Sequence, residues 1–204
     1  MHWLICKERT EIILFLFIWA NAFEERKEII FLSSNEDNWI IRDIMEIRTA
    51  TIADLAQIAA VEAECFPAAE AATKEEFAER IKYYGNHFWL MLEGEKLIAF
   101  VDGFVTDKPD LTDEMYERAE MHDENGAWQM IFGVNTIPAY RKHGYAGQLL
   151  QCAIEDARKQ GRKGLVLTCK EKLIAYYAKF GFENEGISES VHGDVTWYQM
   201  RYEF

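Results

Sequence analysis

Two hydrophobic periods follow one another between residues 128 and 169, and this pattern constrains the fold more than any other part of the chain. The segment AWQMIFGV alternates, which is typical of a strand. Apolar residues at spacings of three and four then run from Ala146 to Ala157, as on one helix face, and GLVLTC predicts a second, buried strand. A strand, a helix and a strand in this order predict a right-handed crossover and an α/β fold with a mixed sheet.

The chain from Glu46 onward alternates strands with helices. EIRTA predicts a short strand, and Thr51 with Asp54 predicts the start of a helix by side-chain capping. Thr73 and Glu76 form a capping box for a second helix. HFWLMLE and LIAFVDGFV predict a hairpin joined at GEK, KLIAYYAKF a further helix, and VTWYQMRY a last strand.

The charge balance excludes one class of partner. The net charge is -13, and a nucleic-acid-binding protein needs a basic surface to neutralise phosphates. An acidic surface instead suits a cationic small substrate. The segment Asp107 to Glu124 carries eight acids and two bases, Lys108 and Arg118, although a solvated face is the ordinary interpretation of such a run.

The cysteines indicate a reducing environment. Cys6, Cys65, Cys152 and Cys169 show no metal-ligand spacing. Cys152 and Cys169 lie among apolar neighbours, as buried thiols do. We therefore expect a cytoplasmic protein without a metal site.

Residues 1–44 precede the main pattern and contain the apolar run IILFLFIWA. Nine residues are too few to span a bilayer, so we expect no membrane association. Three interpretations stay open: a true start at Met45, an added core or partner-binding strand, and a signal peptide cleaved after Ala20-Asn21-Ala22. The polar loop SSNEDNW marks the boundary between this extension and a domain over residues 45–204.

The stretch YRKHGYAGQLL, residues 140–150, joins the alternating strand to the helix. The helix begins near Tyr145, where unpaired N–H groups form a positive dipole end. Small residues at positions 144, 146 and 147 leave this end open to an anion, and Arg141 and Lys142 add positive charge. We interpret the stretch as a pyrophosphate-binding loop; a plain strand–helix turn with solvated cations is the alternative. It matches neither a Walker loop nor the dinucleotide fingerprint.

Two motifs connect this loop to a known family. Arg141-Lys142-His143-Gly144-Tyr145-Ala146 matches the R/Q-x-x-G-x-G/A signature, and YYAKFGF (176–182) matches a second acyl-CoA motif. From about Met45 to Phe204 the chain resembles the GNAT superfamily of N-acetyltransferases. Within it, VEAECFP, LIAFVDGF, LTDEMYERAEMH and YYAKFGFENEG resemble arylalkylamine (serotonin-type) N-acetyltransferases and their bacterial relatives in order and spacing.

The resemblance implies a fold and a co-substrate. The fold is a mixed, mostly antiparallel sheet of about six to seven strands with a splayed central pair and about four flanking helices. Acetyl-CoA is the implied donor, a small-molecule primary amine the implied acceptor, and a homodimer is compatible with it. A backbone N–H near Val134 would polarise the thioester carbonyl. The implied cofactor-binding residues are Phe132, Gly133, Val134, Arg141, Lys142, His143, Gly144, Tyr145, Ala146 and Gly147.

The resemblance also assigns Tyr177 as the general acid that protonates the leaving thiolate, with Tyr176 as its more exposed neighbour. An ordinary packed aromatic is the alternative for Tyr177. His143 is expected to be a solvated residue that assists the phosphates, and His192 either lines the acceptor pocket or belongs to a turn beside Gly193. The expected substrate-binding residues are Phe66, Trp128, Met130, Cys169 and His192.

The general base departs from the arylalkylamine pattern. Those enzymes carry a His-x-His pair on the strand before the loop, where this chain has Trp128 and Met130, and neither side chain accepts a proton. His122, Glu62, Glu64 and a water chain remain candidates for the base. The connection NTIPAY is also about two residues longer than in those enzymes.

Three functions therefore stay open on the sequence: an amine N-acetyltransferase, a non-catalytic acyl-CoA sensor that has lost the base, and an acetyltransferase of protein N-termini or lysines. An enclosed aromatic pocket built from Phe66, Trp89 and Trp197 would favour a small amine, and an open groove would favour a protein.

Overall fold

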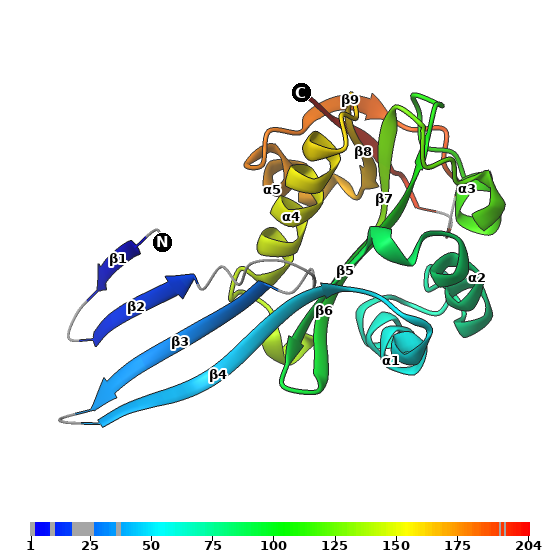
Figure 1. Ribbon diagram of the computed structural model, residues 1–204. Helices are drawn as coiled ribbons and strands as arrows, with labels where there is room; N and C mark the ends of the chain where they lie inside the picture. The colour runs from blue at the N-terminus through cyan, green and yellow to red at the C-terminus, as the bar shows by residue number, and fades with distance from the viewer. Residues whose placement is uncertain (1–2, 9–10, 18–26, 36–37, 192, 194) are drawn as a thin grey trace.

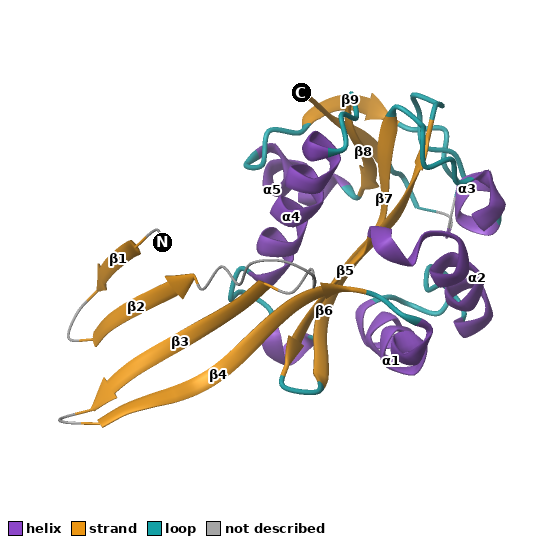
Figure 2. Ribbon diagram, viewed as in Figure 1, coloured by secondary structure: helices purple, strands orange, loops and turns teal. Residues whose placement is uncertain are grey.

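The computed structural model describes residues 3–8, 11–17, 27–35, 38–191, 193 and 195–204, and side chains from Met45 onward. Figure 1 shows the order of the elements and Figure 2 their type. The strands are β1 (Trp3–Glu8), β2 (Glu11–Phe17), β3 (Lys27–Asn35), β4 (Asn38–Thr49), β5 (Phe88–Glu93), β6 (Lys96–Thr106), β7 (Trp128–Thr136), β8 (Gly164–Cys169), β9 (Glu183–Ile187) and β10 (Tyr198–Glu203). The α-helices are α1 (Leu55–Cys65), α2 (Lys74–Tyr84), α3 (Glu114–Glu117), α4 (Tyr145–Lys159) and α5 (Ile174–Ala178), and short 3-10 turns include η2 (Gly85–His87) and η3 (Ala119–Met121).

The strands form one mixed sheet in the order β1-β2-β3-β4-β5-β6-β7-β8-β10-β9. Among the described strands only the β7–β8 pair is parallel. Strands β4 to β10 form the part of the sheet that contains the crossover from β7 to β8. The predicted α/β class with a mostly antiparallel mixed sheet is confirmed. The β3–β4 hairpin projects from this part (Figure 1). Met45, the expected domain start, lies inside β4, and residues 33–35 and 38–39 of the expected boundary loop belong to β3 and β4 instead, because the two strands pair across it.

Helices cover both sides of the central strands, and this explains why β5 and β6 are apolar without interruption. Helices α1 and α2 lie on one side and α4 and α5 on the other (Figure 1). Side chains that point to either face of β5 and β6 are therefore buried, as in Phe88–Leu92 and Leu97–Thr106. Phe77 of α2 packs edge-on against the rings of Phe88 and Phe100.

Local signals in the sequence set the helix ends. Thr73 and Glu76 form the predicted capping box, in which the Glu76 N–H donates to Thr73 Oγ1 at 3.2 Å and the Thr73 N–H donates to Glu76 Oε2 at 2.6 Å. Gly161 follows α4 at φ 75°, the left-handed conformation expected of a helix end. Strand β9 has no alternating apolar pattern and is mostly exposed at the sheet edge, so the sequence did not predict it. No described helix has the length and apolar character needed to cross a bilayer.

A bulge and a separation of strands shape the middle of the sheet. Asp102 pairs with Gly133 while the next residue pairs with Ile131, so Phe132 is one extra residue on β7. The parallel pairing of β7 with β8 ends at Ile131 and Leu167, although β7 continues to Thr136 and β8 to Cys169. The two strands therefore separate beyond the bulge, which is the splayed pair that the sequence resemblance predicts.

Candidate active site

A cavity of about 950 Å³ lies where β7 and β8 separate. Its walls come from α1, α2, α3, the ends of β7 and β8, the loop before α4, and α5. The lining includes, among the predicted site residues, Phe66, Phe132, Gly133, Val134, Arg141, Lys142, Gly144, Tyr145, Ala146, Cys169 and Tyr177. The splayed strands thus bring together the predicted anion-binding loop and the predicted general acid.

The loop before α4 has the geometry that an anion needs. Gly144 is the N-cap of α4 at φ 84°, and a Cβ placed on it would meet no atom within 4 Å, so the backbone lies open there. The first N–H groups of a helix have no partner within the helix, and they attract negative charge. Arg141 Nε donates to the Thr136 carbonyl at 3.0 Å, which holds the loop against the end of β7. These residues fit the pyrophosphate of an acyl-CoA, with Lys142 and Lys172 as further cations on the cavity wall.

Two predicted cofactor residues do not line the cavity. His143 is exposed, stacks on the Tyr145 ring at a centroid distance of 5.7 Å and lies 3.2 Å from the Tyr140 carbonyl through Nδ1. Gly147 faces α5 instead, because a Cβ on it would lie 2.8 Å from the Phe180 ring. Its small size permits close packing of α4 against the YYAKFGF segment, and its role is structural.

Tyr177 lies in α5 with its ring buried and its residue on the cavity wall. Burial, together with the nearby Cys169, Tyr176 and Tyr116, raises the pKa of its hydroxyl above the usual range, so the phenol stays protonated at neutral pH. The hydroxyl makes no hydrogen bond to any described residue, and its proton is available to a bound group. Tyr176 also lines the cavity but is only half-buried.

Glu62 is the buried carboxyl group of this cavity. It lies near the end of α1 with 6% of its surface exposed. Oε1 accepts the Ala72 N–H at 3.2 Å, whereas Oε2 is buried without a hydrogen-bond partner of ordinary geometry among the described residues. Burial and the charge of Asp102 raise its pKa to about 7, although Ala72, Arg80 and Asn135 favour the ionised form. A carboxyl group with this pKa can accept a proton near neutral pH.

Beside Glu62 lies a buried ion pair. Arg80 Nη1 donates to Asp102 Oδ2 at 3.2 Å and Nη2 donates to the Tyr116 carbonyl at 3.0 Å. The guanidinium sits between the rings of Phe77 and Phe132, 5.3 Å from each centroid. Burial raises the pKa of Asp102 to about 6, against the opposing effects of Arg80 and the Gly133 N–H. The pair joins α2 to β6 at the position where Asp102 pairs with Gly133 of the bulged strand β7, and Asp102 adds negative charge near Glu62.

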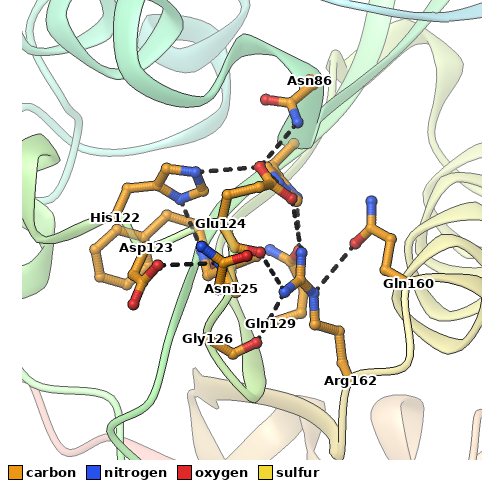
Figure 3. Close-up of polar contacts among 12 residues, drawn as sticks. Asn86, His122, Asp123, Glu124, Asn125, Gly126, Gln129, Gln160 and Arg162 are labelled. Atoms are coloured by element: carbon orange, nitrogen blue, oxygen red, sulfur yellow. Dashed lines mark hydrogen bonds and ion pairs between the residues drawn. The ribbon is translucent and has the colours of Figure 1, made fainter.

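His122, one candidate base, lies outside the cavity in a separate network with Glu124 (Figure 3). His122 Nδ1 accepts the Val105 N–H at 3.1 Å, so its proton is on Nε2, which lies 3.3 Å from Glu124 Oε2. Burial and the nearby His87 lower the pKa of His122. Arg162 Nη2 lies 2.7 Å from Glu124 Oε1, so the carboxylate connects the loop before β7 to the loop before β8. His122 is therefore structural.

The same network has the composition of a metal site, since one ligand atom each of His87, His122 and Glu124 lie within 4.8 Å of one another. Hydrogen bonds assign these atoms differently. The Nε2 of His122 carries a proton and offers no lone pair in this arrangement. His87 Nδ1 lies 2.8 Å from Gln129 Oε1, whose amide nitrogen donates to the carbonyls of Phe104 and Met130. The contacts are those of an ion-pair network that fastens three loops.

The substrate-binding predictions divide by position along β7. Phe66 and Cys169 line the cavity, but Trp128 and Met130 do not. Met130 is fully buried, and the Trp128 ring packs against the Arg201 guanidinium, whose Cζ lies 4.7 Å from the ring centroid. Strands β7 and β8 are still paired at these two positions, and the cavity opens only beyond the bulge. Trp89, expected in an aromatic pocket, is buried under α4 and donates to Asp156 Oδ2 at 2.9 Å, whereas Trp197 lines the cavity. His192 lies outside the described residues.

Sequence reasoning missed part of the cavity wall. Asp113, Tyr116 and Glu117 line it from α3 and the residue before it. The acidic run in the sequence did not distinguish Asp113 and Glu117 from the solvated acids around them. For Glu62 a signal existed, because it lies four residues after Ile58 and next to Val61, on the apolar face of α1.

Comparison with known proteins identifies a family and similar folds. The Acetyltransferase (GNAT) family model matches residues 55–182. The loading GNATL domain of CurA from Lyngbya majuscula has a TM-score of 0.68 and 16% identity, covering 78% of this chain and 97% of its own. The GphF GNAT-like decarboxylase in complex with isobutyryl-CoA has a TM-score of 0.67 and 22% identity, covering 77% and 98%.

Arabidopsis thaliana Naa50, in complex with a bisubstrate analogue containing CoA, has a TM-score of 0.62 and 18% identity, covering 78% of this chain and 99% of its own. At these identities the structural likeness concerns the fold. The family match spans more than half of the chain and contains the loop before α4, Glu62 and Tyr177. The chain belongs to the Acetyltransferase (GNAT) family.

Proposed function

We propose that the protein is an acetyl-CoA-dependent N-acetyltransferase that acts on a primary amine by direct attack in a ternary complex. One observation carries the proposal: a single cavity is lined by the anion-binding loop, by Tyr177 and by Glu62. A non-catalytic acyl-CoA sensor needs the loop alone. A buried carboxyl group that titrates near neutral pH and a buried, protonated phenol are the base and the acid that acetyl transfer to an ammonium requires.

Acetyl-CoA supplies an activated acetyl group, whose bond to nitrogen forms as its bond to sulfur breaks. Glu62 accepts one proton from the ammonium, either directly or through water, and makes the nitrogen nucleophilic. Tyr177 donates its proton to the departing sulfur, and the second proton of the nitrogen, lost as the amide forms, restores the phenol. The proton held by Glu62 passes to water. Arg141, Lys142 and the first turn of α4 hold the pyrophosphate and fix the geometry.

The size of the cavity supports a small acceptor. Ligand pockets measure about 300–1,000 Å³, and this cavity of about 950 Å³ also has to hold the pantetheine arm. At the positions of the His-x-His pair this chain has Trp128 and Met130, which lie outside the cavity. This replacement counts against an arylalkylamine as the acceptor. We further propose that residues 45–204 form the catalytic domain and that the protein acts in the cytoplasm.

A thiol-release assay tests the function. Purified protein with acetyl-CoA is offered monoamines, arylalkylamines, diamines and peptides, and release of free thiol is measured beside acetyl-CoA binding by calorimetry. Release with at least one small amine is expected. If the protein binds acetyl-CoA while no acceptor releases thiol, the sensor interpretation replaces the enzyme, and release with peptides alone would indicate a protein substrate.

Tyr177→Phe tests the proton donor in the same assay. The ring and its packing remain, so acetyl-CoA affinity and folding should barely change, whereas turnover should fall by about 10- to 1,000-fold, since general acid catalysis contributes ~10²–10⁴ and water replaces part of it. Tyr176→Phe is the matched control with a smaller expected effect. Native turnover in Tyr177→Phe would place the proton donor elsewhere.

A further inference from the structure

Carboxylates from separate segments line the cavity. These side chains are Glu62, Glu70, Glu76, Asp102, Asp113 and Glu117. Three have other roles, because Asp102 pairs with Arg80 at 3.2 Å, Glu70 pairs with Lys170 at 2.8 Å, and Glu76 caps α2. Glu62, Asp113 and Glu117 form no ion pair with a described residue. The remaining cations of the lining, Arg141, Lys142 and Lys172, belong to the position proposed for the pyrophosphate, so these three carboxylates are left for a cationic ligand.

Besides Glu70 Oε2, which lies 2.8 Å from Lys170 Nζ, two carboxylate oxygens of this wall are buried without a hydrogen bond to the described residues: Oε2 of Glu62 and Oδ1 of Asp113. Glu62 is itself more than nine-tenths buried, and both residues line the same cavity. A buried acceptor without a donor is costly, so such oxygens indicate a missing partner. A donor that enters the cavity with positive charge would satisfy both the hydrogen bond and the charge.

Asp113 is held in a fixed position and has a neighbour of the same charge. Its Oδ2 accepts the Val191 N–H at 2.9 Å, so the remaining oxygen has a defined place in the wall. Asp113 is the N-cap residue of α3 and Glu117 is the last residue of this one-turn helix, so the two lie about one turn apart, and both line the cavity. Asp113 and Glu117, here named the α3 carboxylates, thus form a second anionic position beside Glu62.

The two positions differ in chemistry. Glu62 has to take a proton from the reacting ammonium, so it does not hold a permanent cation through the reaction. The α3 carboxylates have no part in the proton transfers and remain available to a cation that is not acetylated. A neutral or hydrophobic acceptor would leave Asp113 Oδ1 buried and unsatisfied.

We propose that the acceptor carries two cationic groups, one amine that is acetylated beside Glu62 and a second ammonium or guanidinium group that binds the α3 carboxylates. This substrate class rests on the proposed N-acetyltransferase function. Alkyl diamines are the simplest members, and longer polyamines share the chemistry.

The test compares straight-chain diamines, from diaminopropane to diaminohexane, with the monoamine of the same chain length. For at least one chain length the diamine should have a kcat/KM about tenfold or more above its monoamine, with the difference mainly in KM. Asp113→Asn keeps an acceptor for the Val191 N–H but removes the charge. It should reduce the ratio of diamine to monoamine kcat/KM by about tenfold, because the loss falls on the diamine.

Glu114→Gln is the matched control. Glu114 lies on the same helix, is exposed, pairs with Arg118 at 2.5 Å and does not line the cavity, so the ratio should stay at the wild-type value. Equal kcat/KM for every diamine and monoamine pair would overturn the inference while leaving the acetyltransferase function intact. An equal loss on both amines in Asp113→Asn would also overturn it, since it would assign Asp113 to the support of residue 191 alone. Absence of turnover with every amine would instead contradict the proposed function.

Discussion

Replacing Glu62 by glutamine is expected to lower turnover and, at the same time, to make the protein more resistant to unfolding at alkaline pH. The cavity holds this carboxyl group in a site where burial raises its pKa from 4.5 to about 7. A shift of this size corresponds to about 3 kcal/mol, because one pKa unit is about 1.4 kcal/mol. The wild-type protein therefore contains a strained, ionised carboxylate at pH 8 that the Glu62→Gln variant lacks.

The pH dependence has a defined sign. Between pH 4.5 and about 7 the folded state binds the Glu62 proton more tightly than the unfolded state does. The stability that the protonated group contributes is fully present below pH 4.5 and is lost as the pH rises through about 7. Urea unfolding at pH 4.5 and pH 8 measures this, and the wild type should lose about 3 kcal/mol more than Glu62→Gln over that interval.

Comparing two pH values removes the constant effect of the new amide, whose oxygen still accepts the Ala72 N–H. Glu64→Gln is the matched control, since Glu64 is exposed on the same helix and its removal should leave the wild-type pH dependence. The kcat/KM profile of the wild type should rise with an apparent pKa of about 7. In Glu62→Gln that limb should disappear, with a rate about 10² or more lower. Parallel unfolding curves for wild type and Glu62→Gln would refute the assignment of a raised pKa to this residue.

Two further changes test the loop before α4 and the network around Glu124. Gly144→Val should weaken CoA binding by at least about tenfold, or ~1.4 kcal/mol by calorimetry, because the side chain blocks the open backbone at the N-cap; Gly161→Val, at a similar positive φ of 75° at the other end of α4, should leave CoA affinity unchanged. Burial alone would raise the pKa of Glu124, but hydrogen bonds from His87 and Asn86 lower it to about 2. Glu124→Gln loses these charge-assisted bonds and the ion pair with Arg162, and should therefore reduce the free energy of unfolding at pH 7. The reduction should be about 1–2 kcal/mol, since the Glu124 side chain is 50% exposed and solvent screens the pair. This difference is present above pH 4.5 and lost as the pH falls towards 2, so equal urea midpoints at pH 7 would contradict it.

Features set by neighbouring residues could be read from the sequence. The period of the apolar residues in α4, the capping box at Thr73 and the small residues at the start of α4 act within a few positions of the chain, and the structure contains each of them. The crossover from β7 through α4 to β8 follows from the order of these elements, because a right-handed connection is strongly favoured. The family resemblance rested on the same local segments.

Features that depend on non-local packing could not be read in this way. The bulge at Phe132 ends the alternation along β7, so Trp128 and Met130 are buried where the strands are paired and do not reach the cavity. The edge strand β9 pairs with β10 through backbone hydrogen bonds that leave no apolar pattern in its side chains. In both cases the burial of a residue depends on the strand that pairs with its own strand.

The choice among the candidate bases shows the same division most clearly. Glu62, Glu64 and His122 were equal by residue type, and the sequence identified all three as groups that can accept a proton. Only the assembled structure distinguishes them, because it buries Glu62 in the cavity, leaves Glu64 exposed and fixes His122 through the Val105 N–H. A pKa depends on the burial and charge that surround a group in three dimensions, so the sequence determined which groups can transfer protons and the tertiary structure decided which one is placed to do so.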